Sequence, residues 1–477
     1  MQTYSPGTRV VRVARVVRNT NEARIMLNCH WSRSIVPCII VSQLFLAGCN
    51  KPQGTDGGTA SSTSDSKIAA APKSETATSK RLATAKADDV KAARSRISEL
   101  GSRARFAPKE GDLLTEIVIS DGSSVTADDL ALFGKLSDLE KLQIINCRTL
   151  NDEMVASLSG LKNLKSLSLT NSAINDGGVE TIVNSFPDLT ELDLSSNTNM
   201  SNGVVKIISA LGKLQRLSLV QNRVNDIGAQ RLSKLQELRS LDLRGNMEAG
   251  NMALDVVGEL GKLTAFKHRS TAVDDTGMEA LSRNQAIESL LIQDFVITDQ
   301  SGPHLAKLGK LSQLEVFRCQ GFGTEGVLAL KGMGLTRLTL RDLPNVDDRA
   351  MEVFSELPKL KRLYLHELPS VGDNGLKNLA ALEALELLDI WTVPQMTDAT
   401  VDVISKLPLL KELSIRATSV TDKGVDMLLK MPALQTLTFK ENGSVTAEGL
   451  KKLASKKWAK LDLGTAGGTD GSDAVAP

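Results

Sequence analysis

Apolar residues recur through most of this chain in a six-residue frame whose first, fourth and sixth positions are apolar. Examples are "LKSLSL" from Leu164, "LTELDL" from Leu189 and "LKRLYL" from Leu360. Side chains two residues apart point to the same face of a strand, so each frame predicts a short strand with one buried face. Fifteen frames begin at Leu114, Leu139, Leu164, Leu189, Leu214, Leu238, Leu263, Ile287, Leu314, Leu335, Leu360, Leu385, Leu410, Leu434 and Trp458.

The spacing of the frames is nearly constant. Most begin 24 or 25 residues apart, but the interval is 27 from Ile287 to Leu314 and 21 from Leu314 to Leu335. We interpret these two intervals as an insertion followed by a compensating deletion. Between frames, "INDGGVETI" from Ile174 and "VTDKGVDML" from Val420 place an Asp-x-Gly turn before apolar residues three or four apart. This pattern predicts a short helix whose N-terminus the Asp can cap.

The L-x-x-L-x-L frame resembles the leucine-rich repeat, and the resemblance covers about 350 residues, 114–463. The Asp-x-Gly turn is similar to that of the ribonuclease-inhibitor-like and cysteine-containing subclasses. The resemblance implies an α/β fold, a leucine-rich repeat solenoid (horseshoe) with a parallel concave sheet and short convex helices. No repeat of such a solenoid buries its apolar face alone, so stability comes from stacking neighbours.

A solenoid needs a cover over its first repeat, and residues 81–113 offer one. Val90, Ala93, Ile97 and Leu100 are apolar at helical spacing, and Gly101 follows them. We expect a capping helix over 88–100, then a short strand around 103–106 that pairs with the first repeat strand.

The first 49 residues have the features of a signal peptide. They contain six arginines against one glutamate, and a thirteen-residue apolar run, Ile35 to Ala47, follows Arg33. The run is too short to span a bilayer but suits the core of a signal peptide. The "LAGC" ending at Cys49 resembles the lipobox of bacterial lipoproteins, which implies lipid attachment at Cys49. The alternatives are a chance apolar stretch before a cysteine and, because the basic region is long, a true start at Met26.

Two further segments are poor in large apolar residues. Residues 50–80 and 464–477 are rich in Ser, Thr, Ala and Gly, and cannot bury enough surface to offset chain entropy. We expect a flexible tether and a disordered tail.

The third, fifth and seventh positions of each frame should face outward on the open concave sheet. In "LKRLYLH" these are Arg362, Tyr364 and His366. Equivalent positions of neighbouring parallel strands form columns about 4.8 Å apart. The seventh-position column reads Arg341, His366, Trp391, Arg416 and Lys440.

Basic and aromatic residues gather on this predicted face. In the five frames from Leu263 to Leu360, six of fifteen outward positions are Lys or Arg and none is acidic. Arginine and aromatic residues are favoured in binding hot spots. The alternative is a solvated face whose arginines are tethered to neighbouring acids. The candidate binding residues are Arg318, Arg337, Arg341, Arg362, Tyr364, His366, Trp391 and Arg416.

The residue at the ninth position of each frame indicates how the turn after the strand is built. It is polar at Asn197, Asn222, Asn246 and Thr271, where a side chain can satisfy backbone groups. It becomes apolar and is followed by Pro344, Pro369 and Pro394 in three consecutive repeats, either as a repeated turn variant or as a stiffened rim.

We expect His268 and Cys319, at sixth positions, to be core residues. Cys147 and Cys319 lie about 34 Å apart and cannot pair within one molecule.

The sequence contains no metal, nucleotide or nucleophile motif of known mechanism. The only acid–base pair on the predicted face is His366 with Asp389, so we expect neither catalysis nor a cofactor. We expect a non-catalytic scaffold, exported and lipid-anchored to the bacterial envelope, that holds a protein, a peptide or an anionic glycan. Alternatives are a passive envelope spacer and, less favoured, an enzyme or a ubiquitin-ligase-type substrate receptor. After residue 49 there are 51 basic and 55 acidic residues, a net charge of −4, so we do not expect nucleic acid as a partner.

Overall fold

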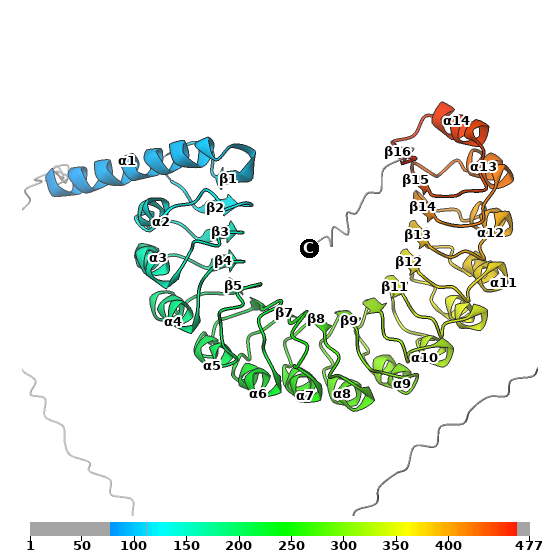
Figure 1. Ribbon diagram of the computed structural model, residues 1–477, viewed down its shortest axis with the longest axis horizontal. Helices are drawn as coiled ribbons and strands as arrows, with labels where there is room; N and C mark the ends of the chain where they lie inside the picture. The colour runs from blue at the N-terminus through cyan, green and yellow to red at the C-terminus, as the bar shows by residue number, and fades with distance from the viewer. Residues whose placement is uncertain (1–76, 112, 465–477) are drawn as a thin grey trace, which may run out of the picture. The chain divides into compact units, whose positions relative to one another are not determined.

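A computed structural model describes residues 77–111 and 113–464. The predicted signal peptide with Cys49, most of the predicted tether and all but the first residue of the predicted tail lie outside the described residues. The described part forms one sheet of sixteen strands in chain order. In Figure 1 the strands follow the inner side of a curve and the helices the outer side. The predicted fold class, a leucine-rich repeat solenoid with a parallel concave sheet, is confirmed.

The strands β2 to β16 are parallel to one another, and each repeat supplies one. Their bounds are β1 Ala104–Ala107, β2 Glu116–Ile119, β3 Lys141–Ile145, β4 Ser166–Thr170, β5 Glu191–Asp193, β6 Arg216–Ser218, β7 Ser240–Asp242, β8 Ala265–Arg269, β9 Ser289–Gln293, β10 Gln313–Phe317, β11 Arg337–Arg341, β12 Arg362–His366, β13 Leu387–Trp391, β14 Glu412–Arg416, β15 Thr436–Lys440 and β16 Lys460–Asp462.

Short helices return the chain over the convex side. The α-helices are α1 Ala77–Glu99, α2 Ala127–Phe133, α3 Asp152–Ala156, α4 Asp176–Ser185, α5 Val204–Ile208, α6 Asp226–Ala229, α7 Asn251–Glu259, α8 Asp275–Leu281, α9 Ser301–Ala306, α10 Thr324–Leu328, α11 Asp373–Leu376, α12 Asp398–Ile404, α13 Asp422–Leu428 and α14 Ala447–Ser455. The 3-10 helices are η1 Gly101–Arg103, η2 Ser157–Gly160, η3 Gln230–Lys234, η4 Asp348–Glu356 and η5 Lys377–Ala381. None of these helices combines the length and apolar character that crossing a bilayer requires.

Burial alternates along the strands as the frame predicts. In β12, Leu363 and Leu365 are fully buried, whereas the side chains of Arg362, Tyr364 and His366 lie on the open face. The same positions of the frame are apolar in every strand. The buried leucines of successive strands therefore form continuous columns between the sheet and the helices. This core leaves the concave face of the sheet uncovered by other elements.

The predicted insertion and deletion around Leu314 are wrong. Leu314 pairs with Leu290 and Leu338, which both occupy the fourth position of their frames. The frame therefore begins at Leu311, which is buried, and both intervals become 24 residues. Two leucines three residues apart fit an L-x-x-L pattern from either start, but only the start at Leu311 keeps the spacing of the other frames, in agreement with the strand pairing.

Helix α1 covers the first repeat. It begins at Ala77, eleven residues before the expected start at Asp88, and buries Val90, Ala93 and Ile97. Gly101 ends it with a φ of 65°, the left-handed conformation that glycine adopts most easily. Strand β1 then pairs antiparallel with β2, the strand of the first repeat.

The Asp-x-Gly motif links neighbouring repeats. Asp398 occupies the Asp position of the motif, although Thr400 stands where the glycine would be. It begins α12, but the side chain that caps this helix is that of the preceding Thr397. Instead, Asp398 Oδ1 accepts hydrogen bonds from the backbone N–H groups of Thr421 and Gly424 in the next repeat, at 2.8 and 3.0 Å. A Cβ at Gly424 would lie 2.6 Å from the same oxygen. Asp398 therefore binds the helix of the following repeat. We had expected it to cap the helix of its own repeat, and this prediction is wrong. Gly424 leaves room for the Asp398 carboxylate.

Buried polar side chains satisfy the turns after the strands. Asn197 is fully buried and donates from Nδ2 to the carbonyls of Leu169 and Leu194, as predicted for the ninth position. Thr271 does not take this role, because it is exposed. Ser270 is buried in its place and donates to the Met247 carbonyl.

His268 fills the core of the same repeat. Its two ring nitrogens lie 3.1 Å from the Leu243 carbonyl and 2.8 Å from the Ala249 carbonyl, and the ring is fully buried. Burial lowers its pKa although both carbonyls act in the opposite direction. His268 is therefore a neutral core residue at physiological pH.

Candidate binding site

Four adjacent strands bring one column of charged and aromatic side chains together. Arg341 of β11 pairs in register with His366 of β12, His366 with Trp391 of β13, and Trp391 with Arg416 of β14. All four side chains are partly exposed on the concave face. The structure therefore brings together the residues of the predicted seventh-position column.

Guanidinium groups lie against the rings of this column. The Arg341 Cζ atom is 4.4 Å from the ring centre of Phe317 and 5.3 Å from that of Trp391. Arg416 Cζ lies 4.9 Å from the Trp391 ring centre, so this indole contacts two guanidiniums. At such distances the ring quadrupole attracts the cation and helps to orient it.

Residues at the third and fifth positions of β11 and β12 extend the arrangement. Arg337 Cζ lies 4.9 Å from the ring centre of Tyr364, and the Tyr364 ring meets that of His366 edge to face at 6.0 Å. His366 in turn meets Trp391 edge to face at 5.8 Å. We call this set the arginine–aromatic cluster. Its members are Phe317, Arg337, Arg341, Tyr364, His366, Trp391 and Arg416.

Asp389 lies beneath the cluster and carries its most buried charge. Its carboxylate is 3.4 Å from His366 Nε2, without the alignment of a hydrogen bond, and 3.5 Å from Arg416 Nη2. Burial acts to raise the pKa of Asp389, but the neighbouring His366 and Arg416 outweigh it and hold the pKa below its ordinary value. The carboxylate is therefore ionised and anchors the Arg416 side chain.

The arginines of the face differ in their pairing. Arg341 Nε lies 3.1 Å from Glu367 Oε1, and Arg416 is paired with Asp389. Among the described residues, no carboxylate lies within ion-pair distance of Arg337 or Arg362. The alternative of arginines tethered to neighbouring acids therefore describes only part of the face.

Arg318 does not lie on the concave strand face, where we had expected it. It follows β10 in the turn, with a left-handed φ of 53°, and is hydrogen-bonded to Asp294. The outward residues of β10 are Gln313, Glu315 and Phe317, so an acid stands among the basic positions. The error comes from the frame at Leu314, which shifted every assignment in this repeat by three residues. The same error hid Phe317, which a frame starting at Leu311 would have placed in the seventh-position column.

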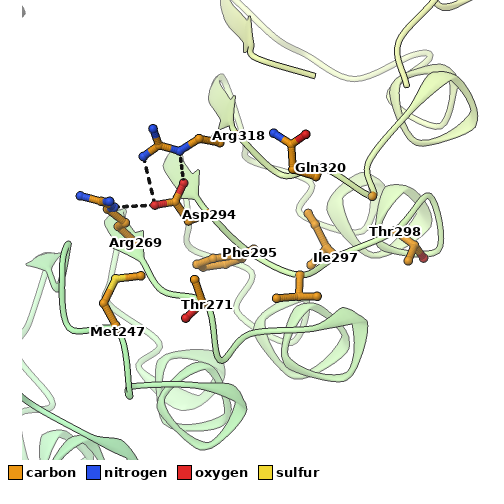
Figure 2. A pocket seen from close by; sticks show the side chains of 11 residues that line it. Met247, Arg269, Thr271, Asp294, Phe295, Ile297, Thr298, Arg318 and Gln320 are labelled. Atoms are coloured by element: carbon orange, nitrogen blue, oxygen red, sulfur yellow. Dashed lines mark hydrogen bonds and ion pairs between the residues drawn. The ribbon is translucent and has the colours of Figure 1, made fainter. Parts of the chain in front are cut away.

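Asp294 binds two arginines at the rim of a pocket of about 610 Å³. Figure 2 shows its carboxylate between the guanidiniums of Arg269 and Arg318, and Arg269 Nε donates to Asp294 Oδ2 at 2.6 Å. Burial acts to raise the pKa of Asp294, but the two arginines lower it overall. Met247 and Phe295 form apolar parts of the pocket wall. Since each guanidinium is already bound to Asp294, we assign no ligand to this pocket.

The arrangement of repeats agrees with comparisons to known proteins. A sequence model of the family described as "Leucine-rich repeat region" matches residues 178–457, and one described as "Leucine Rich repeat" matches residues 160–183. The first match spans more than half of the 477 residues. The chain belongs to the leucine-rich repeat family. No curated protein matches it.

Solved structures share the fold of this leucine-rich repeat protein at low sequence identity. An internalin from Listeria monocytogenes is 17% identical, with 80% of this chain and 97% of the internalin covered and a TM-score of 0.47. A chain of the yeast Rad7–Elc1 complex is 15% identical, with coverages of 78% and 92% and a TM-score of 0.50. A chain of the mouse RP105/MD-1 complex is 15% identical, with coverages of 70% and 57% and a TM-score of 0.46. These likenesses concern the fold alone.

A shallow hollow of about 510 Å³ adjoins the cluster on the concave face of the leucine-rich repeat sheet. Its floor comes from β9 and β10 and includes Leu291 and Glu315. Lys267 lies on one side, and Arg337 with Arg341 on the other. Cationic side chains therefore lie on β8 and again on β11 and β12, whereas the outward residues of β9 and β10 include no cation and one acid, Glu315.

The proline turns border the cluster at the edge of the sheet. Pro344, Pro369 and Pro394 are exposed in three consecutive repeats, while the apolar residues before them are fully buried. Together with Asp342, Glu367 and Thr392, these prolines line a small depression of about 280 Å³. The apolar ninth position thus fills the core where earlier repeats bury asparagine.

In residues 77–111 and 113–464 no three or more His, Cys, Asp or Glu side chains are arranged to hold a metal ion. Cys147 and Cys319 are both buried free thiols. With the frame at Leu311, both occupy ninth positions, where other repeats of this leucine-rich repeat protein bury asparagine.

Proposed function

We propose that this leucine-rich repeat protein is a non-catalytic binding protein whose arginine–aromatic cluster holds an anionic segment of a protein partner. The observation that carries the proposal is the stacking of Arg337, Arg341 and Arg416 on aromatic rings. Arginine loses conformational freedom when it binds, and contact with a ring reduces that loss in advance. The three guanidinium groups are thereby oriented on the concave face before a partner binds.

The chemistry of a guanidinium favours a carboxylate ligand. Its N–H groups form a planar fork that can bind both oxygens of a carboxylate at once. Two guanidiniums and an imidazole already contact the Trp391 ring, which leaves little ring surface for a sugar to stack on. The geometry therefore supports an acidic protein or peptide segment better than an anionic glycan.

We also propose that the protein is exported and anchored to the bacterial envelope by a lipid on Cys49. The charged start, the apolar run from Ile35 to Ala47 and the "LAGC" ending support this location. Metabolic labelling with a radioactive fatty acid should tag the wild type and leave Cys49→Ala unlabelled. Equal labelling of both proteins would refute the anchor without affecting the proposed binding site.

The binding proposal is tested with a glutamate-rich peptide and a polyuronate as parallel probes, each titrated at low and high salt. We expect the peptide to bind more tightly and its affinity to fall with salt, because the contacts are between charges. The double variant Tyr364→Ala, Trp391→Ala should lose peptide binding, whereas Arg216→Ala on the distant strand β6 should not. If the double variant binds both probes as the wild type does, the cluster is not the site, and a passive envelope spacer becomes the better description.

A further inference from the structure

The two ends of the sheet are closed in different ways. Helix α1 covers the first repeat and buries Val90, Ala93 and Ile97 against it. At the other end, β16 pairs with β15 and with no other described strand. The apolar side chains of Trp458, Leu461 and Leu463 remain partly exposed there. The last repeat therefore presents an open strand edge together with an incompletely covered core.

Backbone groups of β16 are free to pair with a further strand. Lys460 donates its N–H to the carbonyl of Gln435, in the direction of β15. Along a strand, successive residues direct their N–H and C=O groups to opposite sides. The N–H and C=O of Leu461 consequently point to the free edge. An exposed edge of this kind is a template for strand addition.

The side chains of β16 are complementary to those of an identical strand running in the opposite direction. Lys460 and Asp462 flank Leu461 and both face the concave side. In an antiparallel pair centred on Leu461, Lys460 of each copy lies opposite Asp462 of the other. Asp462 is already paired with Lys440 of its own chain at 2.8 Å, so each Asp462 carboxylate would lie between Lys440 and the Lys460 of the other copy. A two-fold axis thus forms two further ion pairs and the two backbone hydrogen bonds of Leu461 at once.

We propose that a second copy of this chain covers the end of the solenoid, by antiparallel pairing of the two β16 strands. Among the described strands β1 at the other end also pairs with one strand only, but pairing β16 with β1 of a second copy would leave a free β1 and a free β16 and so continue into a filament, whereas the two-fold pair of β16 strands is closed. The remaining residues 465–477 are a poor cover, since Val475 is their only large apolar residue. The proposal concerns a surface distant from the arginine–aromatic cluster and does not depend on it.

The proposal is tested by analytical ultracentrifugation of the full chain, with detergent and reductant present, over a series of concentrations. The end face of one repeat is small, so we expect a weak dimer whose fraction rises over the concentration series. Lys460→Asp places two like-charged pairs in the interface and should yield a monomer throughout. The charge swap Lys460→Asp, Asp462→Lys, made together with Lys440→Asp to keep the ion pair between β15 and β16, should restore the dimer, whereas Lys457→Asp, outside the strand, should leave dimerisation unchanged.

Amide hydrogen exchange provides a second measurement that a folding defect would not mimic. Exchange at Leu461 should slow as the concentration of the wild type rises, while exchange at Leu437 in β15 should not change. A wild type that stays monomeric to about 200 µM would overturn the proposal. If a variant ending at Gly464 then dimerised, residues 465–477 would themselves occupy the edge. Dimerisation of Lys460→Asp equal to that of the wild type would overturn it as well.

Discussion

The guanidinium of Arg341 lies 5.3 Å from the ring centre of Trp391, although β12 separates their strands. Adjacent strands are about 4.8 Å apart, so the two side chains span about twice that distance above the sheet. His366, between them, exposes only 12% of its side chain and meets the indole edge to face. The Trp391 ring therefore lies over the column and holds the arginines on both sides of it.

This relationship predicts that Trp391 acts through its arginine neighbours. Trp391→Ala should free Arg341 and Arg416 and weaken binding of a glutamate-rich peptide roughly tenfold, in line with about 1–2 kcal/mol for two cation–π contacts. Trp391→Phe should retain part of the affinity, because a smaller ring still attracts the cations. Isothermal titration calorimetry measures both changes. Equal affinities for Trp391→Ala and the wild type would contradict this role.

The contact between Asp398 and Gly424 predicts a specific stability effect. A methyl group at Gly424 would lie 2.6 Å from Asp398 Oδ1 and 2.5 Å from Val420 Cγ1, so Gly424→Ala should destabilise the protein by about 1–3 kcal/mol. Gly443→Ala is the matched control, because nothing lies within 4 Å of a Cβ there. The midpoint of denaturant unfolding reports both changes.

The same contact predicts that the two substitutions are coupled. In the background of Asp398→Ala, which removes the clashing oxygen, Gly424→Ala should cost less than it does in the wild type. Additive losses in this double-mutant cycle would show that the glycine does not make room for the carboxylate.

The buried His268 should make the free energy of unfolding of the protein depend on pH. Burial lowers its pKa in the folded state, so the unfolded chain takes up a proton at a higher pH than the folded protein does. Stability is therefore fully present above the unfolded pKa of about 6.5, and falls below it by up to about 1.4 kcal/mol per pH unit until the folded pKa is reached. Unfolding midpoints measured between pH 8 and pH 5 test this dependence.

The His268→Gln variant separates this effect from other titrations. At pH 8 it should be less stable than the wild type, because glutamine does not fill the space of the fully buried ring against Phe266 and Phe295. Since glutamine does not titrate, the stability gap should narrow as the pH falls. A gap that stays constant from pH 8 to pH 5 would rule out His268 as the titrating group.

We predict that the thiol of Cys319 is unreactive in the folded protein. Burial raises its pKa to about 12, so at pH 8 only about one molecule in ten thousand carries the reactive thiolate. Iodoacetamide should leave Cys319 unmodified in the native protein and modify it in denaturant, as peptide mass spectrometry can show. Rapid alkylation under native conditions would mean that the turn after β10 opens readily.

The repeat could be predicted from the sequence because each strand carries its own apolar signature. The alternation in β12, the buried column of leucines and the capping helix with Val90 and Ile97 all follow from local periodicity. The frame near Leu314 was predicted wrongly although the sequence distinguishes the two starts, because Leu311 keeps the 24-residue spacing and Leu314 does not. Leu311 and Leu314 satisfy the same local pattern, and one wrong choice moved Arg318 onto the sheet and took Phe317 off it.

The sequence by itself determined the repeat, its parallel sheet and the face on which Tyr364, His366 and Trp391 lie, because period and alternation are properties of one chain segment. Only the tertiary structure decided what each side chain contacts. It placed Asp398 on the helix of the next repeat, Arg318 on Asp294, and two guanidiniums on Trp391. These contacts join residues about 25 positions apart, so they depend on how repeats stack and curve, which no single repeat encodes.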